Sequence, residues 1–295
     1  MKIYFYGVRG SIASPGPDTV KFGGNTSCIY VQLESGQDLI IDAGTGIRTL
    51  GSVLLDSQKP ITILLSHWHW DHIEGLPFFK PLYQPGRQIN ILAGMGNPNE
   101  RLNMLSTQMD GARFFPVSAS QLSSTIHYLT EGEQSFLHSQ GIHITMKPLN
   151  HPGGGRAFRI EEEGLSYVHI SDNELDPPNK PQTSYDDWVA FCHGADVLVH
   201  DAQYLEPDMP HKWGWGHSLV SQVRQLALDA EVATLVLFHH DPDRSDSDLV
   251  KIQTESEAFF RDNHSSTKSL CAWEGLTLRM KSGKGPKAKH SIKIE

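Results

Sequence analysis

Cysteine is scarce in this chain, which has three such residues among 295 and no closely spaced pair. The odd count argues against a disulfide framework, and the lack of a Cys-x-x-Cys pattern removes one common type of zinc site. No run of about 18 apolar residues occurs, so the sequence predicts no membrane span. The first residues turn polar after Tyr6, which is not typical of a secretory signal, so we expect a cytoplasmic protein.

Basic charge is not in excess either. The chain has 25 Lys and Arg residues against 34 Asp and Glu residues, for a formal net charge of −9. Proteins that bind nucleic acid neutralise its phosphates with clustered basic side chains. Because this chain has a net negative charge, we do not expect a nucleic-acid partner. Bound divalent cations would make a site locally positive, and a small anion could still bind there.

Apolar patterning indicates one large α/β domain over residues 1–280. Residues 61–65 form a continuous apolar run that is typical of a buried strand, and the apolar spacing over 249–260 predicts a helix. Segment 94–135 is rich in Gly, Asn, Ser and Gln, and we interpret it as a lid or a dimer contact outside the core. The tail 281–295 is basic and is expected to be disordered.

Histidine is abundant, with 16 residues, and three of them fall with an aspartate directly after the predicted strand 61–65. In an extended segment, His67 and His69 point the same way and can share one metal, while Asp71 and His72 face a neighbouring one. Imidazole and carboxylate suit zinc, and also manganese or iron. The alternative is a run of surface histidines between two tryptophans, which the preceding buried strand disfavours.

This spacing resembles the signature of the metallo-β-lactamase superfamily, and later motifs extend the resemblance along nearly the whole chain. It implies an αββα sandwich, with two mixed β-sheets flanked by helices. It also implies two divalent ions, with zinc favoured. The implied ligands are His67, His69 and His151 for one ion, Asp71, His72 and His239 for the other, and Asp172 as a bridge between them.

Two of these ligands have rivals in the sequence. His240 could replace His239, although the predicted strand that ends at Phe238 favours His239. Asp201 could be a ligand in place of Asp172. Both alternatives stay open at this point.

Two segments resemble the branch of the superfamily that contains ribonuclease Z and cyclic-nucleotide phosphodiesterases. One is the strand that ends at Asp201 and is followed by Ala202, and the other is Gly216-His217-Ser218. In that branch the histidine pairs with the acidic residue beside the scissile phosphate, which implies that Asp201 holds His217. Such a carboxylate orients the imidazole and raises its basicity, so that it can donate to a phosphate oxygen. The alternative places His217 simply beside a helix N-cap at Ser218.

The resemblance therefore implies a binuclear phosphodiesterase for a small anionic phosphodiester. The acidic net charge and the lack of a long basic arm make a cyclic nucleotide the specific expectation. Asp71, His217 and Asp201 are the expected catalytic residues, and Asp71 also positions the proton of the nucleophile. Relatives in this branch are often dimers, so we expect a homodimer.

Three other functions remain as alternatives. A ribonuclease Z-like RNA endonuclease is one, although we find no long basic arm of the kind that enzyme carries. A thioester or lactone hydrolase of the glyoxalase II type shares the ligands but not the Gly-His-Ser element. A metal-binding accessory protein without hydrolytic activity is the third.

Departures from other branches narrow the family further. Diiron flavoproteins have Glu where this chain has His69. True β-lactamases generally have Cys at the place of Asp172 or lack a bridging Asp there.

Near the N-terminus, Arg9 or Asn25 could touch substrate, but a structural role in glycine-rich turns is favoured.

Overall fold

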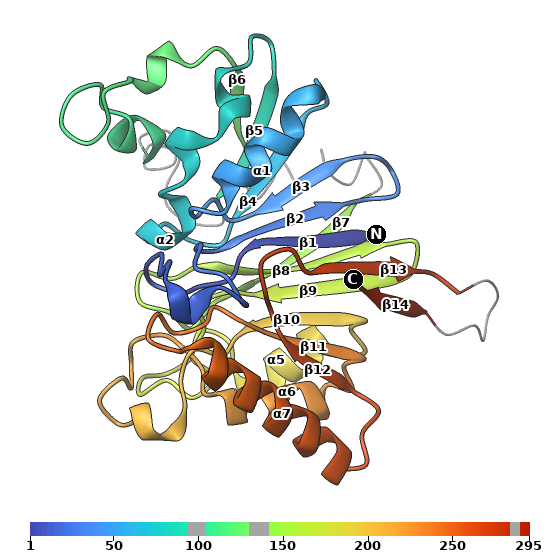
Figure 1. Cartoon of the computed structure of the whole chain (residues 1–295). Helices are drawn as coiled ribbons and strands as arrows, with labels where there is room; N and C mark the ends of the chain where they lie inside the picture. Colours follow the sequence, from blue (N-terminus) through green and yellow to red (C-terminus); the bar gives the residue numbers. More distant parts are fainter. Residues whose placement is uncertain (94–103, 130–141, 284–289) are drawn as a thin grey trace.

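The computed structural model describes residues 1–93, 104–129, 142–283 and 290–295, which form two β-sheets packed face to face between helices (Figure 1). The first sheet has eight strands in the order β14-β13-β1-β2-β3-β4-β5-β6, and the second has six in the order β12-β11-β10-β9-β8-β7. Both sheets mix parallel and antiparallel pairs. The predicted sandwich of two mixed sheets flanked by helices is confirmed.

The element bounds are as follows. The first sheet comprises β1 (Lys2–Gly7), β2 (Cys28–Gln32), β3 (Asp38–Ile41), β4 (Ile61–Leu65), β5 (Gln88–Ala93), β6 (Thr125–Leu129), β13 (Thr277–Lys281) and β14 (Ser291–Ile294). The second comprises β7 (His143–Pro148), β8 (Arg156–Glu162), β9 (Leu165–Ile170), β10 (Val197–Asp201), β11 (Thr234–Phe238) and β12 (Lys268–Cys271). The α-helices whose bounds lie wholly within the described residues include α1 (Ile47–Val53), α2 (Trp70–Ile73), α5 (Tyr185–Cys192), α6 (Val220–Asp229) and α7 (Asp246–Asp262).

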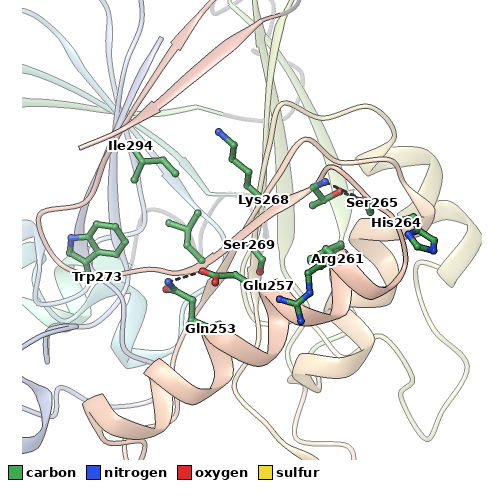
Figure 2. Close-up of a pocket in the computed structure, with 12 residues that line it drawn as sticks. Gln253, Glu257, Arg261, His264, Ser265, Lys268, Ser269, Trp273 and Ile294 are labelled. Carbon is green, nitrogen blue, oxygen red and sulfur yellow. Dashed lines mark hydrogen bonds between the residues drawn. The ribbon is translucent and has the colours of Figure 1, made fainter.

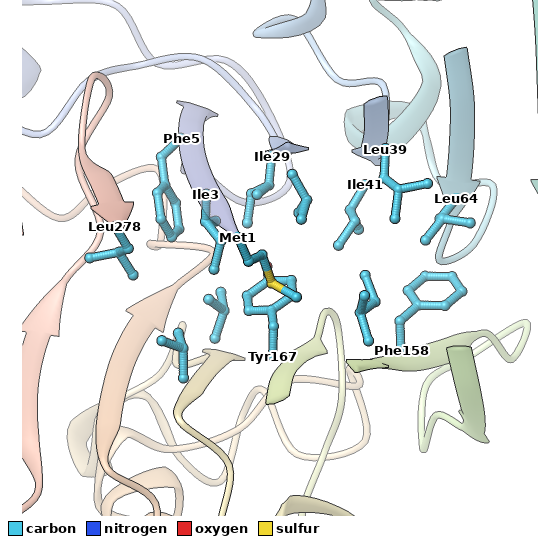
Figure 3. Packing of buried hydrophobic residues seen from close by; sticks show 14 of the residues in the cluster. Met1, Ile3, Phe5, Ile29, Leu39, Ile41, Leu64, Phe158, Tyr167 and Leu278 are labelled. Atoms are coloured by element: carbon cyan, nitrogen blue, oxygen red, sulfur yellow. The ribbon is translucent and has the colours of Figure 1, made fainter. Parts of the chain in front are cut away.

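The main core lies between the two sheets. Strands β4 and β11 are buried at every position, as expected of apolar strands that are covered on both faces. In β1 burial alternates, which turns Ile3 and Phe5 inward. Figure 3 shows these two side chains on the first sheet facing Phe158 and Tyr167 on the second. Burial of one such aliphatic or aromatic side chain contributes about 1.5–3 kcal/mol relative to exposure.

Helices α5, α6 and α7 cover the outer face of the second sheet (Figure 1). Helix α7 follows the N-cap Ser245, whose hydroxyl accepts a hydrogen bond from the Asp248 amide at 3.2 Å. It buries one face, which carries Leu249, Ile252, Ser256 and Phe260. The predicted helix over 249–260 is therefore confirmed and begins three residues earlier. Among the described residues, no helix is both long and apolar enough to span a bilayer.

Segment 94–135 is partly integrated into the core, which corrects our interpretation. Strand β6 pairs in parallel with β5 as the edge of the first sheet. Met104, Leu105 and Met109 are buried against the same layer. Placing this segment outside the core was therefore wrong for these residues. A role as lid or dimer contact stays a prediction, and 94–103 and 130–135 lie outside the described residues.

The end of the chain also differs from expectation. Strand β14 pairs antiparallel with β13, with Ile294 opposite Leu278, and Ile292 packs against the core. The prediction of a disordered tail is wrong for these residues, because two alternating isoleucines allow them to extend the sheet. Residues 284–289 lie outside the description.

Candidate metal centre

Strands β4, β7, β9 and β11 lead into loops that carry the candidate ligands. In both sheets, the carboxyl ends of parallel strands fix the start of a loop while the loop itself exposes side chains. These loops bring together His67, His69, His151, Asp172 and His239, and the short helix α2 adds Asp71 and His72. Residues more than 170 positions apart in the sequence thus meet at one edge of the sandwich.

The candidate ligand atoms form two groups that share one residue. The first group is His67, His69, His151 and Asp172, and all its ligand atoms lie within 4.8 Å of one another. The second group is Asp71, His72, Asp172 and His239, with the same limit. The structure therefore gathers the residues into the two sets that the sequence implied.

The carboxylate of Asp172 divides between the groups. Its Oδ2 lies 3.5 Å from Nε2 of His67 and 3.8 Å from Nε2 of His151. Its Oδ1 lies 3.1 Å from Nε2 of both His72 and His239. One oxygen faces each group, as a bridging ligand requires.

A buried carboxylate orients the histidines from behind. Nδ1 of His72 donates to Oδ2 of Asp42 at 2.8 Å. The Ser66 hydroxyl donates to the same oxygen at 2.9 Å, and it lies 3.0 Å from Nδ1 of His67, from which it can accept. Because Nδ1 of each ring is occupied, Nε2 of each ring faces Asp172. Such partners fix the tautomer and orientation of a ligating histidine.

The other ligands have their own supports. Nδ1 of His151 donates to the Gly216 carbonyl at 2.9 Å, and Nδ1 of His239 donates to Oε1 of Gln203 at 2.9 Å. The amide of Ser11 donates to Oδ2 of Asp71 at 2.8 Å. Loops from both sheets thus hold the ligand groups in place.

The donor set fits divalent metal ions. Nε2 of His67 and Nε2 of His72 are buried and have no hydrogen bond. A buried polar atom without a partner is costly and needs an explanation, which a bound cation provides. Imidazole nitrogen and carboxylate oxygen are the donors that zinc accepts in catalytic sites. The residues present therefore fit the predicted pair of ions.

Local electrostatics favour the ligating forms of His67, His151 and Asp172. Burial, reinforced by the nearby His72, holds the pKa of His67 well below its usual value, and burial lowers the pKa of His151 to about 4. Burial alone would raise the pKa of Asp172, but the charges of His239 and His72 outweigh it and hold that pKa well below the usual range. At neutral pH the imidazoles of His67 and His151 are therefore neutral, and the carboxylate of Asp172 is ionised. In His72 burial alone would lower the pKa, but the nearby carboxylates of Asp172, Asp71 and Asp42 outweigh it and hold that pKa well above its usual value.

His217 and Asp201 form a pair beside both groups. Nδ1 of His217 donates to Oδ2 of the fully buried Asp201 at 3.0 Å. The His217 ring stacks on that of His239, with centroids 5.2 Å apart, and meets the His151 ring at 5.4 Å. Burial alone would lower the pKa of His217, but Asp201 outweighs it and raises the pKa to about 9. His217 is therefore protonated at neutral pH.

The rivals named from the sequence lie elsewhere. Nε2 of His240 donates to the Ala272 carbonyl at 2.9 Å, outside both ligand groups. Asp201 groups with His217 and His239 rather than with the first ligand group. The geometry thus favours His239 and Asp172 as ligands.

The two N-terminal candidates have structural partners. Arg9 is fully buried and donates to the carbonyls of Gly23 at 2.8 Å and Arg244 at 2.7 Å. The Asn25 amide donates to Oε2 of Glu274 at 2.8 Å. These contacts support a structural role for Arg9 and Asn25, which the glycine-rich turns had favoured, rather than a contact with substrate.

Sequence reasoning missed the residues behind the ligands, above all Asp42. It follows β3 directly and has a φ of 59°, and His239 has a φ of 58°. Backbone strain in non-glycine residues persists where the surrounding structure enforces it, and it gathers at functional sites. The sequence did contain a signal that could have found Asp42. It is an aspartate directly after a buried strand, and several predicted ligands also follow directly after a strand.

Comparison with known proteins supplies the family. Residues 37–240 match the model of the beta-lactamase superfamily domain, which is more than half of the chain. The chain belongs to the beta-lactamase superfamily. The predicted family is confirmed, and with it the class of metal-dependent hydrolase.

Individual relatives are distant but span most of the chain. A ribonuclease Z from Exiguobacterium sibiricum is 22% identical over 251 residues, covering 71% of this chain and 80% of that protein. Unliganded yeast PDE1 aligns with a TM-score of 0.65 at 12% identity, over 94% of this chain and 98% of that one. Zn²⁺-bound PqqB from Methylobacterium extorquens aligns with a TM-score of 0.64 at 18% identity, over 95% and 100%. The predicted resemblance to ribonuclease Z is confirmed, and the two structures share the fold.

Proposed function

We propose that this protein is a binuclear metal-dependent phosphodiesterase that hydrolyses a small phosphodiester, with a cyclic nucleotide as its specific substrate. The observation that carries the proposal is the His217–Asp201 pair beside both ligand groups. Hydrolysis of a phosphodiester expels an alkoxide, which needs a proton as it leaves. A histidine whose pKa is about 9 carries that proton at neutral pH.

Two divalent ions, with zinc favoured, would bind the two groups. His67, His69 and His151 would hold one, Asp71, His72 and His239 the other, and Asp172 both. When bound, the ions activate water and offset negative charge on the phosphoryl oxygens. The nitrogen and oxygen donors and the zinc-bound relative support this choice of metal.

Two side chains of the protein, His217 and Asp71, can carry out the proton transfers of the reaction. Nδ1 of His217 is engaged by Asp201, which leaves Nε2–H as the donor for the leaving oxygen. Oδ2 of Asp71 accepts from the Ser11 amide and lies 3.0 Å from Nε2 of His239. The Asp71 carboxylate can receive or position the proton of the attacking nucleophile. The two transfers thus involve separate side chains.

A ribonuclease Z-like RNA endonuclease is the second candidate. The names of the curated relatives favour it, since the Exiguobacterium sibiricum protein is one of several called ribonuclease Z. The net charge of −9 opposes it, because a polyanionic substrate needs basic side chains for affinity. The charge therefore places the small phosphodiester first.

One screen separates these functions. Metal-loaded protein is offered bis-p-nitrophenyl phosphate, a thioester and a lactone, with metal-stripped protein as the control. We expect turnover of the phosphodiester alone, and only with metal. Preference for the thioester or lactone would contradict the proposal and favour a carbonyl hydrolase. No turnover of any of the three would favour an accessory protein.

A second panel separates small substrates from RNA. It contains 2′,3′- and 3′,5′-cyclic nucleotides and a precursor tRNA. We expect a cyclic nucleotide to be hydrolysed and the precursor tRNA to stay intact. The homodimer and the cytoplasmic location remain predictions, and sedimentation of the metal-loaded protein tests the first.

A further inference from the structure

Two hollows on the described part of the protein differ in their relation to the metal centre. A cavity of about 700 Å³ is lined by residues of α7 and β12, and its lining includes none of the candidate ligands. Figure 2 shows Arg261 and Trp273 among the side chains that line it. A cleft of about 350 Å³ is lined by His151 itself. The smaller hollow therefore opens beside the first ligand group.

We name this hollow the proline cleft after Pro152, Pro177, Pro178 and Pro181, which line it. Its lining comes from the chain over 177–182, from Gly214, and from Pro152 and His151. A volume of about 350 Å³ lies at the small end of the range of about 300–1,000 Å³ for ligand sites. It can hold one nucleoside rather than a stretch of RNA.

Buried hydrogen bonds fix the walls of the proline cleft. The carboxylate of Glu174, a buried residue, accepts from the amides of Gly214 at 2.9 Å and Gly216 at 3.1 Å. The indole of Trp213 donates to the Asp176 carbonyl at 2.8 Å, which links the segment that contains Gly214 to the segment that begins the 177–182 lining. The cleft is thus preformed.

Glycine is required where the wall meets the ligand group. Gly216 has a φ of +91°, and a Cβ there would lie 2.1 Å from Nδ1 of His151. Its carbonyl is also the acceptor that orients His151. The same short segment therefore shapes the cleft, orients a candidate metal ligand and leads into His217.

The lining has the chemistry of a nucleobase site. Pyrrolidine rings offer apolar surfaces against which a planar heterocycle can pack. Asn179 and Gln182 are exposed at the cleft, and amide side chains pair with the donor and acceptor edges of bases. Lys180 adds a cation for an anionic substrate in a protein whose net charge is −9.

We propose that the proline cleft binds the nucleobase of the substrate, with Asn179 and Gln182 as the residues that recognise it. This proposal rests on the phosphodiesterase function proposed above and names the part of the protein that selects nucleotides. A nucleoside in the cleft would lie beside His151, with its phosphate towards the ligand groups. Specificity would then arise outside the ligand set.

The test compares two diesters that share one leaving group. Thymidine 5′-(p-nitrophenyl phosphate) carries a nucleobase, and ethyl p-nitrophenyl phosphate does not. We measure kcat/KM for both with metal-loaded wild type and with the double variant Asn179→Ala/Gln182→Ala. The ratio of the two values should fall about tenfold in the double variant, as expected for the loss of one or two hydrogen bonds. Lys251→Ala, at an exposed position on α7, is the control and should leave the ratio unchanged.

The outcomes separate this proposal from the function on which it rests. If both diesters are hydrolysed and the double variant keeps the wild-type ratio, the proline cleft does not select the base, although the phosphodiesterase function stands. If wild type hydrolyses neither diester, the proposed phosphodiesterase function fails. Binding of thymidine 5′-monophosphate then tests whether the proline cleft binds a nucleobase. Weaker binding by the double variant would support the cleft, and unchanged binding would overturn it. Thermal unfolding of each variant confirms that it is folded.

Discussion

The two ligand groups differ in charge and exposure although they share Asp172. In the first group the remaining donors are imidazoles, and His69 is exposed. Its Nδ1 lies 2.9 Å from Nε2 of His151, which lines the proline cleft. In the second group Asp71 adds a carboxylate, and Asp42 places another behind His72. More negative charge and deeper burial strengthen the attraction for a cation. The second group should therefore hold its ion more tightly, while the first, through His151, adjoins the cleft proposed for the substrate.

Removal of the shared residue should abolish the difference between the groups. Asp172→Ala takes away the oxygens that face both groups, so we expect metal content to fall from about two ions per chain to near zero and turnover to be lost. Metal analysis after dialysis checks this, with the exposed Asp262→Ala on α7 as the control. Retention of one ion with wild-type affinity would show that Asp172 does not bridge.

His217 lies beside both groups without belonging to either set of proposed ligands. His217→Ala should keep both ions yet lower kcat by about 10²–10⁴ for a diester with a poor leaving group, because the proton donor is lost. The loss should shrink with p-nitrophenolate, which leaves without help. The exposed His193→Ala serves as the control. Equal losses for both leaving groups would replace proton donation with charge stabilisation alone.

The carboxylate behind His72 gives a way to weaken one group more than the other. Asp42→Asn removes the charge that accepts from Nδ1 of His72, so affinity for the tighter ion should fall about 10–100-fold. Affinity for the weaker ion should fall less, because Asp42 reaches His67 only through the Ser66 hydroxyl. Competition with a chelator measures both constants, and an equal loss at both groups would contradict the proposed inequality.

The smallest expected effect is a shift in pH dependence. The charge of Asp201 keeps the pKa of His217 at about 9 against the opposing effect of burial. If the protonated form is active, kcat/KM should persist up to about pH 9 and fall above it. Asp201→Asn should lower this pKa, so the rate should begin to fall at a lower pH than in wild type. If kcat/KM falls at the same alkaline pH in Asp201→Asn as in wild type, a group other than His217 controls that fall.

Local patterns in the sequence predicted the fold, and they singled out candidate ligands that the structure brings together. The run His67 to His72 follows an apolar strand that is buried at every position, so one short segment predicts both a strand and a cluster of candidate ligands. His151, Asp172 and His239 were found through the resemblance, and the structure brings them to the same place.

Other features depend on partners that are distant in the sequence. Strands β6, β12 and β14 are short edge strands whose stability comes from the neighbouring strand rather than from their own pattern. Asp42 and Gln203 support the ligands through hydrogen bonds across 30 and 36 residues. The proline cleft likewise requires Gly214 to meet the chain near Pro178, which no local periodicity reveals.

The most direct test of the account is a titration of metal-free protein with zinc while hydrolysis of bis-p-nitrophenyl phosphate is followed. Because the second group is more negative and more buried, the first equivalent should bind tightly and give little activity. The second equivalent should bind more weakly and bring the phosphodiesterase to full turnover. Full activity at one equivalent, with no gain from the second, would contradict a binuclear phosphodiesterase built on two unequal groups.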